Sequence, residues 1–237
     1  MSPESSPIRD PSRRRACPGV LNFVVAASLC SPLLSCNIVG PVAYLALGPP
    51  KVEAQYLLVD RPTLVFVDDR NNAIPLAASR IRRAIADKAS TDLMAMEILT
   101  KTISPRDAMA VTRERDRNDR LLPIEAIGEI VDAQQVIYVE MVSFVGSPDG
   151  VTPRATAVCR VKVIDVANRT RLFPAPDAQE PWQLVSVTTR AVDLELYRSP
   201  AGRRQIELML AEQLGDRVAK LFYKHVPDEL GSRLQRR

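Results

Sequence analysis

The sequence contains a single histidine, His225, and no histidine, cysteine or serine cluster at a spacing typical of catalysis or metal binding. A histidine-based metal site or a Ser-His dyad is hard to build around one imidazole. Because His225 follows the expected end of a helix, it more simply interacts with exposed carbonyl groups there. We therefore expect no catalytic residues, no metal site and no cofactor, and a protein that is not an enzyme.

Glycine is also scarce, with 9 residues against 19 prolines, which predicts stiff connections rather than flexible linkers. The formal net charge is only +4. A nucleic-acid-binding protein presents a concentrated basic face. The most charged run, Arg113–Arg120, instead alternates in sign and indicates a solvated helix end or loop. The composition therefore argues against a nucleic-acid partner.

The first fifty residues contain an uncharged stretch, 16–50, directly after the arginines at 13–15. Residues 20–29 have the length and polarity of a signal-peptide h-region. Three prolines interrupt the stretch, and a clean membrane-spanning helix needs about 20 predominantly apolar residues. The tetrapeptide Leu33-Leu34-Ser35-Cys36 then resembles the bacterial lipobox, in which the cysteine thiol receives diacylglycerol and becomes the first residue.

This pattern predicts lipidation at Cys36 and four segments: a signal peptide (1–35), an apolar lipidated tether (36–59), a single α/β domain (60–225) and a basic tail (226–237). An uncleaved membrane anchor or an apolar core segment are the alternatives for the first stretch. Asn37 is not the aspartate that retains such proteins in the inner membrane. We therefore expect the outer membrane, facing the periplasm. The tether either packs on the domain or lies at the lipid surface.

The four cysteines fall into different predicted segments. Cys17 and Cys30 would leave with the signal peptide, and Cys36 would carry lipid. Only Cys159 remains as a thiol, so no internal disulfide can form. Because Cys159 lies on the apolar side of its strand, we expect an inert core thiol.

Hydrophobic periodicity predicts the order β-α-β-α-α-β-β-β-α for the rest of the chain. Strands interleaved with helices, followed by a meander, indicate an α/β fold with a mixed sheet of about five strands and helices packed on it. Helices are expected to start at Pro75, Pro105 and Pro123 and to close the chain. The expected strands are 63–67, 99–103, 136–145, 154–163 and 183–189, and the closing helix is 201–223.

Asp68 and Asp69 end the first strand, where ligands often bind in open α/β sheets. Adjacent carboxylates on a strand point to opposite faces, so they cannot easily share a metal or a proton. The dipeptide therefore indicates a structural loop entry. The alternative function is a small-ligand-binding or enzymatic α/β domain with a pocket near Asp68, Asp69 and Glu140. Trp182, the sole tryptophan, is expected in the core or at its rim.

Three segments carry a resemblance to known proteins: 64–69 before a long helix, 123–133 leading into 136–140, and 161–166 after the Asp149-Gly150 turn. Their order over residues 60–223 resembles a group of envelope proteins. The group includes the amino-terminal domain of TolB, the curli-secretion lipoprotein and the lipoprotein activators of penicillin-binding proteins. The resemblance implies a non-enzymatic periplasmic binding or assembly module, and it carries over no functional residue beyond Cys36.

The sequence thus favours a lipid-anchored periplasmic domain that recruits or regulates an envelope partner. A homo-oligomeric secretion component is a variant of this hypothesis. We see no long amphipathic hairpins suited to a transmembrane barrel, so the recruiter is favoured. The expected partners are a membrane, through lipid on Cys36, and an envelope protein.

Overall fold

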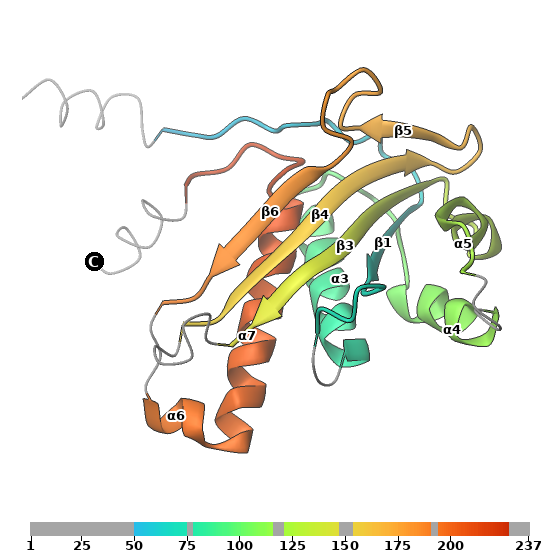
Figure 1. Cartoon of the computed structure of the whole chain (residues 1–237). Coiled ribbons are helices and arrows are strands. Elements are labelled where there is room, and N and C mark those ends of the chain that lie inside the picture. Colours follow the sequence, from blue (N-terminus) through green and yellow to red (C-terminus); the bar gives the residue numbers. More distant parts are fainter. Residues whose placement is uncertain (1–49, 75–77, 116–120, 147–153, 191–193, 228–237) are drawn as a thin grey trace, which may run out of the picture. The chain divides into compact units, whose positions relative to one another are not determined.

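The computed structural model describes residues 50–74, 78–115, 121–146, 154–190 and 194–227. The chain separates into two units at Pro50, and the second unit is described below. The predicted signal peptide and the lipobox at Cys36 lie outside the described residues. The elements follow the order β1 (Thr63–Asp68), α3 (Ala78–Ala95), β2 (Thr102–Ile103), α4 (Pro105–Arg115), α5 (Ile124–Ile130), β3 (Gln135–Val145), β4 (Thr156–Asp165), β5 (Thr170–Phe173), β6 (Gln183–Thr188), α6 (Leu194–Arg198) and α7 (Pro200–Ala219) (Figure 1).

The strands form one mixed sheet, which confirms the predicted fold class. Its order is β2-β1-β3-β4-β5, and β6 also pairs with β4. β1 runs parallel to β2 and β3, whereas β4 is antiparallel to β3, β5 and β6. β5 and β6 occupy successive parts of the same edge of β4, at residues 163–165 and 156–161. The parallel half of the sheet therefore comes first in sequence, and the meander follows it.

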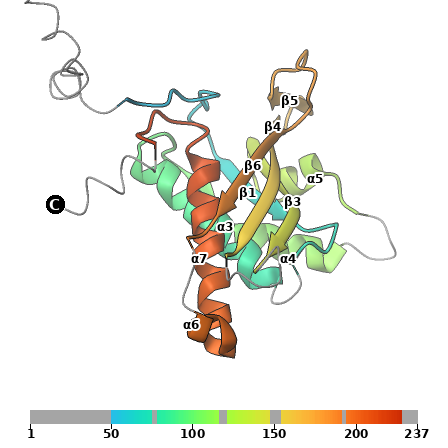
Figure 2. The ribbon, with the colours of Figure 1, turned by 60° about the vertical axis from the view of Figure 1, so that its left-hand side comes forward.

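One face of the sheet is covered by the two long helices, α3 and α7 (Figure 2). Ile81, Ile85 and Leu93 recur at helical spacing on α3 and are fully buried. α7 starts at a cap in which the Ser199 hydroxyl accepts a hydrogen bond from the Gly202 N–H (2.9 Å). The two helices approach closely at Gly215, where a Cβ atom would lie 2.6 Å from the Ile85 carbonyl oxygen. Only glycine fits this contact without displacing α3.

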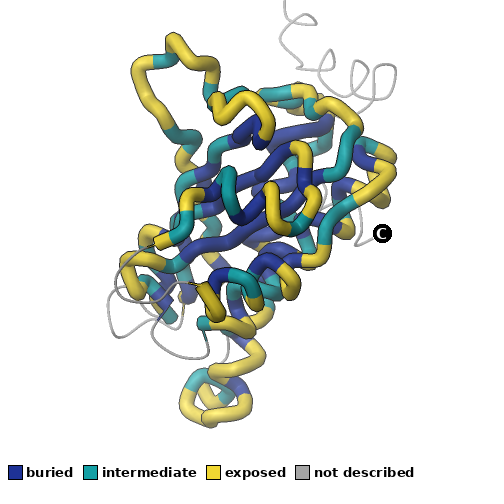
Figure 3. Tube along the Cα trace, turned by 90° about the vertical axis from the view of Figure 1, so that its right-hand side faces the viewer, coloured by how far each residue is buried: buried dark blue, intermediate teal, exposed yellow. Residues whose placement is uncertain are grey.

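The opposite face is covered at one end by α4 and α5 (Figure 2). Ile124 and Ile127 of α5 and Ala108 of α4 pack against Leu64, Phe66, Val136 and Tyr138 of the sheet. Figure 3 shows the buried central strands of the sheet in dark blue. α5 has only 7 residues and α7 has 20. The second face is therefore covered over β1 and the start of β3, but not over the rest of the described sheet.

Several local features differ from the sequence prediction. The closing helix, expected over 201–223, ends at Ala219. The structure adds the strand β5 and the helix α6, of 4 and 5 residues, which are too short to show a hydrophobic period. The helix α3 was expected to bury Met96, but it ends at Ala95 and Met96 is 54% exposed. The N–H groups of Ile98 and Leu99 both donate to the Leu93 carbonyl and close the helix. The expected strand 99–103 is consequently reduced to Thr102–Ile103.

The sheet is tied to the segment before β1 by a polar cluster around Arg61. Its guanidinium donates to Gln135 Oε1 (3.2 Å) and to Asp165 Oδ2 (2.9 Å). The Asn168 backbone N–H also donates to Asp165 Oδ1 (2.8 Å). The Asn168 hydrogen bond and the Arg61 guanidinium hold the pKa of this carboxyl below its ordinary value of 3.8. A single cluster therefore fixes the start of β3 against the end of β4.

We predict that Asp165→Asn lowers the free energy of unfolding at pH 7 by about 2 kcal/mol, because it weakens charge-assisted hydrogen bonds. Asp165 is 5% exposed, so little water replaces its partners. Since its folded pKa is depressed, the stabilisation is present above the unfolded value and is lost as pH falls through the lower folded value. Urea unfolding from pH 7 to pH 3 should therefore show the wild type and the variant converging at acid pH.

The exposed Asp177→Asn serves as the control and should change stability by less than about 0.5 kcal/mol at any of these pH values. A constant difference between Asp165→Asn and wild type over the whole range would contradict the account.

Candidate functional site

We call the face of the sheet opposite to α3 and α7 its outer face. The polar residues of this face lie in rows that run across the strands. Directly paired residues of neighbouring strands have side chains on the same face. One row consists of Phe66, Tyr138 and Lys162. The next row consists of Asp68, Glu140, Arg160 and Leu184, one residue from each of β1, β3, β4 and β6. The second row crosses from the helix-covered end of this face to its uncovered end.

Each carboxylate of the second row is engaged by neighbours. Asp68 Oδ2 accepts hydrogen bonds from Arg70 Nε (2.5 Å) and from the Tyr138 hydroxyl (2.9 Å). Burial, followed by the negative charge of Asp68, raises the pKa of Tyr138 above its ordinary value of 10.0. Glu140 Oε1 accepts from Arg160 (2.9 Å) and from Asn71 Nδ2 (3.1 Å). The row is thus internally neutralised at Asp68 and Glu140.

Asp69 lies apart from this row. Its two carboxylate oxygens accept the backbone N–H groups of Ala73 (2.7 Å) and Ile74 (3.2 Å), so it holds the loop after β1. The structure therefore brings together two members of the predicted pocket, Asp68 and Glu140, and separates the third. The loop role of Asp69 agrees with the prediction of a structural loop entry.

Lys162 has a different environment from the other cations of this face. Its ammonium lies 4.3 Å from the Trp182 ring centroid and 5.2 Å from that of Tyr138. In the part of the chain that the structure describes, no carboxylate lies within salt-bridge distance of it. Partial burial lowers the pKa of Lys162, although Glu125 and Glu140 oppose the shift. Among the described residues, this partly desolvated cation therefore has no carboxylate within salt-bridge distance.

We use the name open face for the following residues: Glu140, Val158, Arg160 and Lys162 of β3 and β4, Val142 at the bulge of β3, Leu184 of β6, and Trp182, which directly precedes β6. No helix of the described ranges covers them (Figure 1). Leu184 is 61% exposed and Val142 is 42% exposed. Arg160 lies over the Trp182 ring at 5.1 Å, so apolar and cationic groups alternate on this face. Sequence reasoning placed Trp182 in the core or at its rim but did not bring it together with Lys162.

β6 forms the edge of the sheet next to the open face. The Thr189 N–H donates to the Ala155 carbonyl (2.8 Å), so the backbone of Thr189 points toward β4. In an antiparallel pair, the backbone groups of successive residues point alternately toward and away from the partner strand. The backbone groups of Leu184, Ser186 and Thr188 therefore point away from β4. The strand Gln183–Thr188 contains no charged residue and no proline. Its outward carbonyl at Leu184 is met by the Gln183 side-chain amide (3.1 Å).

A second feature is a polar cavity at the carboxyl end of β1, which we call the carboxyl-end pocket. Its volume is about 260 Å³. It is lined by Phe66, Asp68, Arg70, Ser79, Arg82, Met109, Thr112, Arg113 and Ile127. Arg113 belongs to the alternating run that the sequence indicated as solvated. It is indeed exposed, but it also faces this cavity, a contact that no local pattern could predict.

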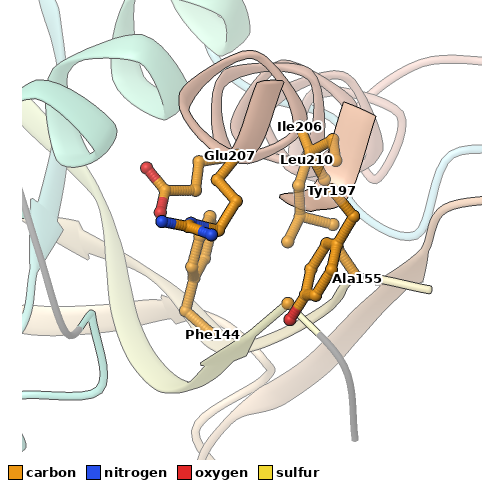
Figure 4. A pocket seen from close by; sticks show the side chains of 8 residues that line it. Phe144, Ala155, Tyr197, Ile206, Glu207 and Leu210 are labelled. Carbon is orange, nitrogen blue, oxygen red and sulfur yellow. The ribbon is translucent and has the colours of Figure 1, made fainter. Parts of the chain in front are cut away.

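A third feature is a smaller, mainly apolar cavity of about 140 Å³ between the ends of β3 and β4 and the helices α6 and α7 (Figure 4). The rings of Phe144 and Tyr197 lie on opposite sides of it, and Ile206 and Leu210 line it from α7. Arg203 and Glu207 also line it. No cluster of catalytic side chains lies among these residues.

The two remaining sequence candidates, His225 and Cys159, occupy structural positions. The backbone of His225 pairs with Val52 in both directions (2.7 and 3.0 Å), and its Nδ1 lies 3.1 Å from the Tyr223 carbonyl oxygen. Cys159 is fully buried on β4, and burial raises the pKa of its thiol to about 12. Within the described ranges, no group of three or more His, Cys, Asp or Glu is placed to hold a metal. The described helices are also too short or too polar to cross a membrane.

No protein-family model and no curated protein matches the chain. Solved structures with a similar fold include a PelC dodecamer from Paraburkholderia phytofirmans, with a TM-score of 0.39, 13% identity and coverage of 73% of this chain and 97% of that one. Lipoprotein GNA1162 from Neisseria meningitidis gives a TM-score of 0.35, 13% identity and coverage of 67% and 98%. Protein XCC0632 from Xanthomonas campestris gives a TM-score of 0.39 and 10% identity, and the match covers 73% of this chain and 90% of that one. At these values the likeness concerns the fold alone.

We predict that Lys162→Met leaves the free energy of unfolding within about 1 kcal/mol of wild type, because lost cation–ring contacts are offset by removal of a partly desolvated charge. Arg61→Met should instead lose about 3 kcal/mol, since it leaves Asp165 buried without its cation. Urea unfolding followed by circular dichroism measures both. A loss at Lys162→Met as large as that at Arg61→Met would show that Lys162 serves the fold.

Proposed function

We propose that this chain is a lipid-anchored protein of the bacterial envelope that recruits or regulates another envelope protein through its open face, without catalysing a reaction. The observation that carries the proposal is the uncovered half of the sheet. Sheets pack one or both faces on a core, and an uncovered face is normally polar. Here Leu184 and Val142 are exposed, and Leu184 follows Trp182 by two positions, which favours a surface that another protein covers.

The charges on the open face indicate the chemistry of the partner. Lys162 is partly buried, lies over the Trp182 and Tyr138 rings, and forms no salt bridge within the described part of the chain. A partner that presents a carboxylate next to apolar side chains would pair with Lys162 and bury Leu184 at the same time. Interfaces are enriched in tryptophan and arginine, and both are present here as Trp182 and Arg160.

The edge of β6 supports the same location. Natural edge strands are usually protected by charged residues, prolines or bulges. Gln183–Thr188 has no charge and no proline, and its outward backbone groups lie next to Leu184 of the open face. A partner bound to the open face could also cover this edge. The meander end of the sheet is therefore the favoured interaction surface.

The segment before β1 fits a tethered domain. Gln55 and Tyr56 donate their backbone N–H groups to the Leu221 carbonyl, and Tyr56 and Leu58 pack against the core. The part of the predicted tether from Val52 onward thus belongs to the folded unit. From Cys36 to Lys51 a fully extended chain spans at most roughly 50 Å. Lipid on Cys36 would keep the domain within that distance of the membrane.

The membrane attachment is tested by the intact mass of the protein purified from a bacterial membrane fraction. We expect loss of residues 1–35 and added acyl mass, because the thiol of Cys36 is the lipidated group. Cys36→Ala should abolish both changes, and a lipoprotein signal peptidase inhibitor should block the cleavage.

Cys30→Ala is the matched control, since Cys30 lies six residues before the predicted lipidated cysteine and should not affect processing. An unmodified full-length mass in the soluble fraction would overturn the proposed anchor.

The interaction surface is tested by a photo-reactive amino acid placed at Leu184 in living cells. We expect one discrete cross-linked adduct, because the side chain is exposed on the open face. Lys162→Glu in the same chain should reduce its yield at least tenfold, since it places a carboxylate opposite the partner's carboxylate. The probe at Leu208, which is 38% exposed on α7, is the control and should give no such adduct.

Equal adducts from both probe positions would exclude the open face as a specific surface. An adduct with twice the mass of the chain would instead identify a second copy as the partner, which is the homo-oligomeric variant of the hypothesis.

A further inference from the structure

We propose that the carboxyl-end pocket binds a phosphate group, either as a free phosphate compound or as part of a lipid headgroup. This site is separate from the proposed open face, and it does not depend on the lipid anchor or on a protein partner. Three observations carry it: its place in the topology, the charge of its lining and the way its cations are held.

The pocket lies where the strand order of the parallel part of the sheet reverses. From β1 the chain passes through α3 to β2, and from β2 it passes through α4 and α5 to β3 on the other side of β1. α3 and α4–α5 lie on opposite faces of the sheet. In open α/β sheets, ligands bind outside the carboxyl ends of the strands at such a reversal. Asp68, the last residue of β1, lines the cavity.

The lining is cationic. Among the described residues that line the cavity, three are arginines, Arg70, Arg82 and Arg113, and one carries a carboxylate, Asp68. Asp68 already accepts hydrogen bonds from Arg70 and Tyr138, so its charge is largely matched within the protein. No carboxylate of the described residues lies within salt-bridge distance of Arg113. Arg113 is therefore the cation of this lining with which an anion in the cavity would pair most directly.

Two of the cations are held in place by the fold itself. Arg82 donates through Nε to the Val67 carbonyl (2.7 Å), which anchors the α3 side chain at the end of β1. Arg70 is anchored through Nε to Asp68 (2.5 Å). Anchored guanidinium groups lose little freedom when an anion arrives, and their planar donor sets match the oxygens of a phosphate group. The arrangement favours an oxyanion over a metal ion, which would need several free oxygen ligands.

The cavity, of about 260 Å³, has room for a small group. A phosphate group with part of the molecule that carries it would fill this space. Ser79 at the start of α3 and Thr112 on α4 add hydroxyl groups to the wall, and Met109 and Ile127 supply its apolar part.

The test is thermal unfolding and titration calorimetry of the full chain in detergent with sodium phosphate, against sodium chloride at equal ionic strength. We expect phosphate alone to raise the melting temperature and to give saturable binding. Arg113→Ala should weaken binding at least tenfold. Because Arg113 is exposed, this variant should fold normally. Arg115→Ala, two residues along α4 and outside the pocket lining, is the matched control and should bind like wild type.

A second measurement separates the two sources of the phosphate group. Titration with glycerol 3-phosphate and with soluble dihexanoyl phosphatidic acid gives tighter binding of the lipid if a headgroup is the ligand, and equal binding if the phosphate group alone is recognised. Equal effects of phosphate and chloride, or phosphate binding that Arg113→Ala and Arg82→Met leave unchanged, would overturn the proposal. Neither result would affect the cross-linking test of the open face.

Discussion

The two faces of the sheet are covered by helices of different length, and the rest of the structure depends on this difference at β3. This strand has 11 residues, or roughly 36 Å at about 3.3 Å per residue. On one side α7, with 20 residues, extends over about 30 Å, whereas on the other α5, with 7 residues, extends over only about 10 Å. Residues of β3 up to Val139 are buried on both faces, but Val142 and Val145 are exposed. The outer side of β3 is therefore exposed beyond the residues that α5 covers.

The charged residues of the outer face accordingly have two kinds of surroundings. Under the helix-covered end, Asp68 is buried and its charge is matched by Arg70 and the Tyr138 hydroxyl. Beyond it, Lys162 rests on Trp182 with no close carboxylate among the described residues. The Tyr138 ring contacts both environments, since it stacks on Phe66 and lies 5.8 Å from Trp182. The carboxyl-end pocket and the open face therefore lie next to each other on the same sheet.

The fold could be predicted because its evidence is local. The fully buried stripes of α3 and α7, and the alternation that buries Cys159 and Val161 but not Arg160, are periodic patterns that each segment carries by itself. The site could not be predicted, because its contacts join distant segments. Arg113 and Arg82 are 31 positions apart, and Trp182 meets Lys162 only because β6 returns along β4. The alternative prediction named a pocket near Asp68, Asp69 and Glu140, whereas the cavity at the end of β1 is lined by Asp68 but by neither of the other two.

Because Cys159 is buried, the rate at which its thiol is modified can serve as a measure of how often the folded core opens. Its thiol is fully buried at the centre of β4, where it pairs with Met141 on one side and Val185 on the other. A thiol with a pKa of about 12 is almost entirely protonated at neutral pH and unreactive while the sheet is closed. Because this thiol lies in the core that α3 and α7 cover, a reagent can reach it only when that core opens. The rate of that modification therefore reports the opening frequency of the sheet that carries both surfaces, from within the native chain and without an added probe.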